Sequence, residues 1–305
     1  MEGWAMVRCW RGLIFALLLA ATGLGVTPSF ADPGGGILAE NQADGAIVRG
    51  IQKAELAKFA QMQPGSATAG EGPFYEFASI AYCPGAAVGL TGFDDFCKQA
   101  TLFCTGNTVG TGLGPAVEIM RREVDAAGAP VPGATWTSVG ITCFPELVPG
   151  SAPTLTMAMV LEQFHRTKFA LPDVSMQPVG NRTLVNLPTY YQVDWAAGGF
   201  APQSIDTSTI IGRQVEIRPT FQWVEYHYGD GTSSGREQSL GGPYPTGNIR
   251  HTYTAIGDRQ VQATVSYGGE FRVDGGAWIP IPDTVEIQGT PQALTVLEAR
   301  ARLVR

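Results

Sequence analysis

The stretch Phe221–Asp230, FQWVEYHYGD, followed by Gly231, decides the fold of this chain. Its aromatic and β-branched residues favour an extended strand, and the Asp-Gly pair favours a tight turn in which the Asp side chain caps backbone N–H groups. Downstream, His251-Thr252-Tyr253 and the alternating run Val261–Val265 predict strands that continue the sheet. The stretch therefore predicts a half-buried antiparallel sheet in a mainly β fold.

The C-terminal part, from residue 176 to the end, shows the same alternation of strand and turn. Further strands are predicted at 184–193, 215–217, 261–267 and 271–273. Asp274-Gly275-Gly276 predicts a hairpin turn before the strand Ala277–Ile279, because glycine readily adopts the positive φ that such turns need. Residues 297–303 alternate between apolar and charged side chains, which favours a closing edge strand.

These residues resemble the PKD domain, an immunoglobulin-like β-sandwich common in secreted and surface proteins. The match is carried by Tyr226–Thr232, His251-Thr252-Tyr253, Gly257 and Val261–Val265, with Tyr226 in place of the usual Trp and His227 in place of the first Asp. The insertion 235–247 is longer than typical. The resemblance implies a PKD-like β-sandwich over residues 176–305. Its structural motif would consist of Tyr226, Tyr228, Gly229, Asp230, Gly231, His251 and Tyr253.

His251 and Tyr253 alternate with Thr252, so both side chains can point toward the core. A buried imidazole or phenol needs a hydrogen-bond partner, and we expect that partner to be backbone near the turn. We therefore predict a structural role for both residues rather than a catalytic one.

The N-terminus has the pattern of a secretory signal peptide, residues 1–31. Arg8 and Arg11 precede an apolar run at Leu13–Ala21, and Ser29-Phe30-Ala31 provides a small-residue cleavage site. No later segment has the roughly 18 unbroken apolar residues of a membrane-spanning helix. The sequence predicts export to the medium or the cell surface, with no transmembrane segment after cleavage.

Four cysteines remain once Cys9 leaves with the signal peptide: Cys83, Cys97, Cys104 and Cys143. An even number in an exported chain predicts two disulfides. The chain has no Cys-x-x-Cys motif and its histidines lie far downstream, so a zinc site is not expected. Two short strands predicted at 102–104 and 136–143 each carry a cysteine, which favours pairing Cys104 with Cys143 and Cys83 with Cys97. The other two pairings remain open.

The predicted organisation has four parts after the signal peptide. Residues 32–73 form a tail, a helix over 43–62 and a linker, and residues 74–150 form a small disulfide-containing α+β region that includes a strand at 117–120. A bridging helix lies within 151–175, and the β-sandwich occupies 176–305. The layout, with its export signal, resembles uncharacterised secreted or surface proteins of Gram-positive bacteria. The helix over 43–62 either packs on its own domain or binds a partner.

Charge and motif content exclude several function classes. The mature chain has 18 basic and 26 acidic residues, a net charge of −8, and lacks the basic surface that nucleic-acid binding requires. It contains no Gly-x-Ser-x-Gly, and the glycine-rich stretch 106–114 lacks the Lys-Ser/Thr ending of a phosphate loop. Asp206, Asp230 and Asp258 are single acids and form no calcium-loop pattern. The sequence therefore predicts no catalytic residues, no metal site and no cofactor.

The functional hypothesis that follows is a non-enzymatic extracellular interaction module. Trp223, Tyr244 and Trp278 are candidate binding residues for an extracellular protein or polysaccharide, because aromatic faces anchor interfaces and stack on sugar rings. The alternative is a secreted cell-wall or polysaccharide hydrolase with its site in residues 74–150 and a PKD-like accessory domain. An assembly subunit acting through the helix over 43–62 is a third hypothesis. The sequence indicates no oligomeric state.

Overall fold

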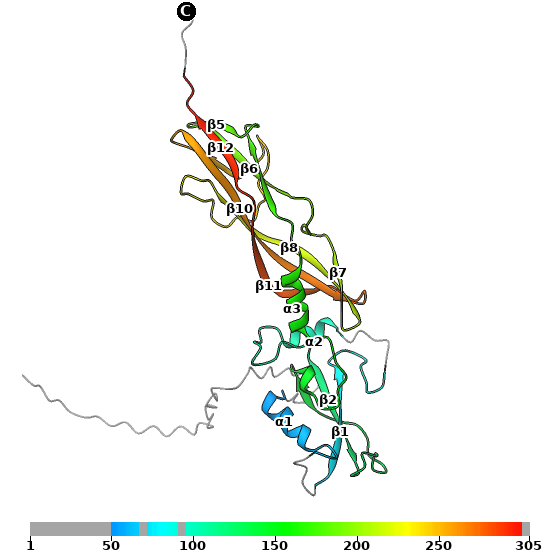
Figure 1. Cartoon of the computed structure of the whole chain (residues 1–305). Coiled ribbons are helices and arrows are strands. Elements are labelled where there is room, and N and C mark those ends of the chain that lie inside the picture. Colours follow the sequence, from blue (N-terminus) through cyan, green and yellow to red (C-terminus); the bar gives the residue numbers. More distant parts are fainter. Residues whose placement is uncertain (1–49, 67–71, 91–95, 301–305) are drawn as a thin grey trace, which may run out of the picture. The chain divides into compact units, whose positions relative to one another are not determined.

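The computed structural model describes residues 50–66, 72–90 and 96–300 (Figure 1). The predicted signal peptide and residues 43–49 of the predicted first helix lie outside this part of the chain. Strands account for 42% of the chain and helices for 12%, so the protein is mainly β, as predicted. In the described ranges, no helix is long and apolar enough to cross a membrane.

The cysteine-bearing region contains a three-stranded antiparallel sheet of order β1-β2-β3. Its elements are α1 (Lys53–Gln61), β1 (Phe74–Ala81), α2 (Lys98–Phe103), β2 (Val117–Val124), β3 (Thr137–Thr142) and the 3-10 turn η1 (Pro145–Leu147). From α1, Leu56 and Phe59 are buried in one cluster with Phe77 and Ile119 of the sheet. The rings of Phe59 and Phe77 are stacked, with centroids 5.1 Å apart. The apolar side of α1 is therefore used within its own region.

Two local predictions for this region are wrong. Residues 102–104 belong to the end of helix α2 and its C-cap rather than to a strand, because a three-residue apolar run is too short to reveal a helical period. The predicted first helix begins only at Lys53. The N-cap residue Gln52 is extended, and the N–H of Ile51 donates to the Ile141 carbonyl at 2.7 Å.

The two disulfides are Cys83–Cys97 and Cys104–Cys143, the pairing that the sequence favoured. Cys97 is the N-cap of α2 and Cys104 its C-cap, so the disulfides hold both ends of this six-residue helix. A helix this short is not stable by itself. Tertiary cross-links therefore keep α2 in place.

The predicted bridging helix is α3 (Met157–Arg166). Thr156 caps its N-terminus by accepting a hydrogen bond from the Met159 N–H. The N–H of Met157 donates to the carbonyl of Gly114 at 2.8 Å, while Val160 and Phe164 are buried in the core of the C-terminal part. Helix α3 thus contacts both the cysteine-bearing region and the strands that follow it.

The C-terminal part contains two sheets. Its strands are β4 (Pro172–Gln177), β5 (Arg182–Leu184), β6 (Pro188–Trp195), β7 (Asp206–Ile210), β8 (Arg213–His227), β9 (Arg250–Thr252), β10 (Gly257–Val273), β11 (Ile279–Gln288) and β12 (Gln292–Leu297). One sheet has the order β4-β6-β9. The other has the order β5-β12-β10-β8-β7, with β11 also paired to β10. The long strands β8 and β10 pair side by side along their length (Figure 1).

The two sheets share one hydrophobic core. Tyr191 of β6 lies against Tyr226 and Tyr228 of the segment containing β8, with ring centroids 5.9 and 5.1 Å apart. Val261, Ala263 and Val265 of β10 are buried, whereas the residues between them are more exposed. The period-two pattern therefore identified the buried face of β10 correctly.

Several strand boundaries differ from the sequence-based predictions. The strands predicted at 261–267 and 271–273 form one strand, β10, and the strand predicted at 277–279 begins only at Ile279. The strands predicted at 215–217 and 221–228 form one strand, β8, which continues through Pro219. It ends at His227, so Tyr228 lies just beyond it. The strand predicted at 184–193 is divided between β5 and β6, and Asn186 between them has a φ of 63°. Strand β12 ends at Leu297, so the prediction of an edge strand starting there is wrong for residues 298–300; residues 301–303 lie outside the described part.

The hairpin predicted at Asp274-Gly275-Gly276 is confirmed. It joins β10 to β11, with Phe271 opposite Ile279. Asp274 and Gly275 have φ values of 47° and 77°, and two consecutive positive φ values are typical of the turns that suit the twist of β-hairpins. Asp274 also accepts a hydrogen bond from the Gln214 N–H at 2.8 Å, which ties the turn to the start of β8.

Candidate functional site

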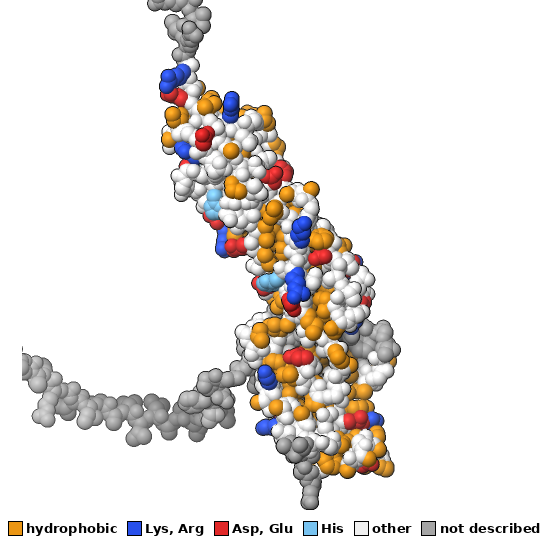
Figure 2. Space-filling model, viewed as in Figure 1, with side chains coloured by type: hydrophobic (Ala, Val, Ile, Leu, Met, Phe, Trp, Pro, Cys, Tyr) orange, Lys and Arg blue, Asp and Glu red, His pale blue; other side chains and the backbone are white. Residues whose placement is uncertain are grey.

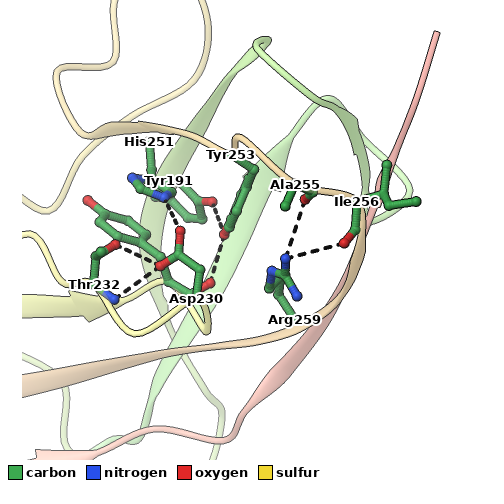
Figure 3. Close-up of polar contacts among 9 residues, drawn as sticks. Tyr191, Asp230, Thr232, His251, Tyr253, Ala255, Ile256 and Arg259 are labelled. Carbon is green, nitrogen blue, oxygen red and sulfur yellow. Dashed lines mark hydrogen bonds and ion pairs between the residues drawn. The ribbon is translucent and has the colours of Figure 1, made fainter.

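Asp230 and His251 form a bonded pair at the turn that follows β8 (Figure 3). The Asp230 carboxylate lies 2.7 Å from Nε2 of His251, and both side chains are about one-fifth exposed, at 21% and 20%. Asp230 also accepts hydrogen bonds from the hydroxyl and the N–H of Thr232, at 2.7 and 3.1 Å. The carboxylate therefore joins its own turn to strand β9.

A chain of buried hydroxyl groups lies beside this pair. The Tyr253 hydroxyl donates to the Tyr228 carbonyl at 2.9 Å and lies 2.8 Å from the Tyr191 hydroxyl, so Tyr191 is the donor in that second bond (Figure 3). The His251 ring stacks on the Tyr228 ring, with centroids 4.1 Å apart and planes 4° from parallel. The hydrogen bonds and the stacking together fix the position of β9 against the end of β8.

The environment shifts the pKa values of these groups in directions that suit structural hydrogen bonding. Burial raises the pKa of Tyr253 to about 12, and burial together with the bond to Tyr253 raises that of Tyr191 further. For Asp230, desolvation raises the pKa, but the hydrogen bonds from Thr232 and His251 outweigh it, and the pKa is lowered from 3.8. The tyrosines thus stay protonated while Asp230 stays ionised at neutral pH.

The structure brings the predicted structural motif together, with one difference in bonding. Tyr253 bonds to backbone near the turn, whereas His251 bonds to the side chain of Asp230. Gly229 has a φ of 75°, and a Cβ there would lie 2.6 Å from the Gln260 carbonyl oxygen. The geometry of the motif is that of a turn anchored to the neighbouring strands β9 and β10.

The three candidate binding aromatics lie in different environments. The Arg236 guanidinium lies over the Trp223 ring at 4.3 Å. Two guanidinium groups lie over the Trp278 ring, those of Arg218 at 4.2 Å and Arg272 at 4.7 Å. Both tryptophans are only partly exposed, whereas Tyr244 is 68% exposed. Of the three, Tyr244 is the side chain most accessible to a ligand.

Tyr244 lines an apolar groove, which we call the Tyr244 groove, with a volume of about 520 Å³. Its other lining residues are Gln177, Pro178, Val179, Leu187, Pro188 and Tyr190. Val179 is 82% exposed and Leu187 is 38% exposed, so these apolar side chains face solvent. The sequence did not predict these partners of Tyr244. Pro178-Val179 is an apolar pair in a loop and Leu187-Pro188 one at the start of β6, and that is the only local signal they give.

Hydrogen bonds and ring contacts hold the Tyr244 groove in shape. The Tyr244 N–H donates to the side-chain oxygen of Gln177 at 2.9 Å, and the Tyr244 ring packs edge-on against Tyr190 with centroids 5.5 Å apart. The N–H of Gly242 donates to the Tyr191 carbonyl at 3.0 Å. The loop that carries Tyr244 is therefore attached to β6 and to the end of β4, which lowers the entropy cost of binding.

Two further cavities of the described residues involve the cysteine-bearing region. One is lined by Gln61, Met62, Gly72, Pro73, Phe74, Tyr75 and Arg121, and the other by Thr101, Leu102, residues 104–107, Leu113, Met157, Leu161, Pro280 and Pro282. Neither lining contains an Asp or Glu side chain, so neither provides the carboxylate pair that a glycosidase needs. Among residues 50–66, 72–90 and 96–300, no three His, Cys, Asp or Glu side chains are grouped to hold a metal ion.

Comparison with known proteins finds no family model that matches the chain and no similar protein among the curated ones.

Proposed function

We propose that this chain is an exported, non-enzymatic interaction module with a PKD-like C-terminal domain, and that the Tyr244 groove is its binding site. The two sheets with one shared core and the Asp230 turn support the PKD-like assignment. The signal-peptide pattern of residues 1–31 supports export to the medium or the cell surface.

The exposed apolar surface around Tyr244 carries this proposal. Exposed apolar side chains that cluster in one groove are typical of an interaction site, whereas scattered ones are not. Tyrosine is favoured in such sites because it buries a large area at a low cost in side-chain entropy. The side chains that line the groove include no Asp, Glu, Lys or Arg.

The partner that best fits the groove is an extracellular protein segment with apolar side chains. Such a segment would cover Val179 and Leu187 while packing against the Tyr244 ring. The alternative ligand, which the binding test below also covers, is a polysaccharide stacked on the Tyr244 ring. Export itself predicts that protein recovered from the culture medium begins near Asp32, which N-terminal sequencing checks.

The groove is tested by selecting displayed random peptides, and screening purified wall polysaccharides, on the full chain. Tyr244→Ala is the test variant, and Ile256→Ala is the control because Ile256 is also apolar and 62% exposed but does not line the groove. A central aromatic contact is worth about 2 kcal/mol, so Tyr244→Ala should weaken binding about 30-fold and Ile256→Ala should leave it unchanged. Equal binding by both variants, or no binding to either class of ligand, would contradict the proposal.

A further inference from the structure

A second, polar hollow of about 640 Å³ lies on the six-stranded sheet and shares no lining residue with the Tyr244 groove. Its polar side chains come from three segments. Thr220 and Gln222 belong to β8, Glu270 belongs to β10, and Asp283 and Thr284 belong to β11. Gly268 and Gly269 also line it.

The two glycines have different neighbours. A Cβ on Gly268 would lie 2.4 Å from Nε2 of Gln222 and 3.0 Å from the Thr220 hydroxyl oxygen. A Cβ on Gly269 would lie 2.7 Å from the Phe164 ring. Glycine inside a strand weakens it and often marks a close approach of a ligand or another chain segment. At Gly268 the missing side chain lets the Gln222 amide pack directly against the backbone of β10, where it borders the hollow.

The polar groups around the hollow are held in place by hydrogen bonds. Glu270 accepts from the Arg218 guanidinium at 3.1 and 2.5 Å, and Asp283 lies 2.8 Å from Nε2 of His165. The Gln222 side-chain N–H donates to the Thr220 hydroxyl at 3.2 Å. A carboxylate can accept about four hydrogen bonds, so both acids retain acceptor capacity for a ligand.

The charges around the hollow favour a neutral ligand. Its lining includes two acidic side chains and no Lys or Arg, which disfavours phosphate, sulfate or other anions. The Arg218 guanidinium lies against Glu270 from outside the lining, which reduces the net attraction for a cation, and Asp283 lies against the His165 ring. On the face drawn in Figure 2, basic and acidic side chains also lie close together rather than in separate large patches.

We propose that this hollow binds a neutral saccharide. Sugar hydroxyl groups would donate to Glu270 and Asp283 and exchange hydrogen bonds with Gln222 and the threonine hydroxyls. Pro280 and Pro282, which also line the hollow, offer an apolar wall for the C–H face of a sugar ring. This site does not depend on ligand binding in the Tyr244 groove, because the two sites have no lining residue in common.

The test is calorimetric titration of the full chain with neutral oligosaccharides of glucose, mannose, galactose and N-acetylglucosamine. Gln222→Ala removes an exposed amide from the hollow, and Gln238→Ala is the matched control because it removes an exposed amide outside the lining. Loss of one hydrogen bond should raise the Kd about fivefold in Gln222→Ala and leave it unchanged in Gln238→Ala.

Two further variants separate this site from the Tyr244 groove. Gly268→Ala should reduce saccharide binding by displacing Gln222, with circular dichroism used to verify that the sheets are intact, whereas Tyr244→Ala should bind the saccharide normally. Saccharide binding that depends on Tyr244 and not on Gln222 would overturn this inference and leave the proposed function standing. Absence of binding to every saccharide in the set would also overturn it.

Discussion

Asp230 shows how one side chain stabilises a long connection in the chain. It bonds to Thr232 within its own turn and to His251 of β9, 21 residues further along. Its pKa is lowered from 3.8 in the folded protein, because the hydrogen bonds to its charged form outweigh desolvation. A carboxylate with a lowered folded-state pKa stabilises the fold above its unfolded pKa, and this contribution is lost as the pH falls through the folded value.

Asp230→Asn should therefore destabilise the protein in a pH-dependent way. We expect the free energy of unfolding to fall by about 2 kcal/mol at pH 7, as hydrogen bonds to a charged group are lost. The difference from the wild type should narrow as the pH falls below about 4, since the carboxyl group of the unfolded wild-type chain is protonated first and the folded one only at lower pH. Urea unfolding at pH 7, 5 and 3.5 measures this difference. A stability difference that is the same at all three pH values would show that the ionised Asp230 carboxylate does not stabilise the fold.

A matched control for this experiment is Asp173→Asn. Asp173 is exposed and accepts a hydrogen bond from the Gln292 side chain at 2.7 Å. Surface substitutions of this kind change stability by no more than about 0.5 kcal/mol. The control therefore separates the effect of the Asp230–His251 bond from that of removing one negative charge.

The hydrogen bonds of the tyrosine hydroxyls predict that Tyr253→Phe destabilises the fold more than Tyr191→Phe does. Tyr253→Phe removes the group that both donates to the Tyr228 carbonyl and accepts from Tyr191, so it leaves two buried polar groups without this partner. Tyr191→Phe removes only a donor at the end of the chain. We expect the free energy of unfolding to fall by about 3 kcal/mol in Tyr253→Phe and by about 1 kcal/mol in Tyr191→Phe, as measured by chemical denaturation. Equal losses would show that the hydroxyls do not act as a chain.

At the scale of elements, the turn after β8 depends on two glycines with different neighbours. Gly229 and Gly231 have φ values of 75° and 90°. A Cβ on Gly229 would lie 2.6 Å from the Gln260 carbonyl oxygen, whereas no atom lies within 4 Å of a Cβ on Gly231. The first glycine is required by both backbone conformation and space, and the second by conformation alone.

Alanine substitution separates these two requirements. Gly231→Ala should cost about 1 kcal/mol, the usual penalty for a side chain at positive φ. Gly229→Ala should cost about 3 kcal/mol, because strand β10 must also shift to relieve the clash. Thermal and urea unfolding of the two variants test this difference. The model of the turn is wrong if Gly231→Ala is the more damaging change.

Local patterns predicted the existence of elements better than their boundaries. The hairpin at Asp274-Gly275 was found because its turn residues carry the required conformation themselves. Helix α2 was missed because only six residues form it and tertiary disulfides hold its ends. Strand β8 was predicted as two pieces because Pro219 is a poor strand residue in isolation.

At the scale of the whole molecule, the disulfides should stabilise one region selectively. Cys104–Cys143 closes a loop with a sequence separation of 39 residues and Cys83–Cys97 one of 14. The chain-entropy model gives about 4 and about 3 kcal/mol for loops of these lengths. The cysteine-bearing region has only small hydrophobic clusters, whereas the C-terminal strands share a large core.

Replacing Cys104 and Cys143 together by alanine should therefore expose the cysteine-bearing region first. In hydrogen exchange, amides of β1, β2 and β3 should lose protection, while those of β8 and β10 should keep most of theirs. The Cys83→Ala/Cys97→Ala double variant serves as the comparison and should have the smaller effect. An equal loss of protection in β8 and β10 would show that the two regions unfold as one unit.

The sequence by itself determined the mainly β character, the buried face of β10 and the Asp-Gly turns, because alternation and turn chemistry act between near neighbours in the chain. It also supplied an even set of cysteines and a preferred pairing. Only the tertiary structure decided that β5 pairs in parallel with β12, and that residues 177–179, 187, 188, 190 and 244 line one groove. These contacts join residues far apart in sequence, and they form only because burial of a shared core fixes how the sheets and loops meet.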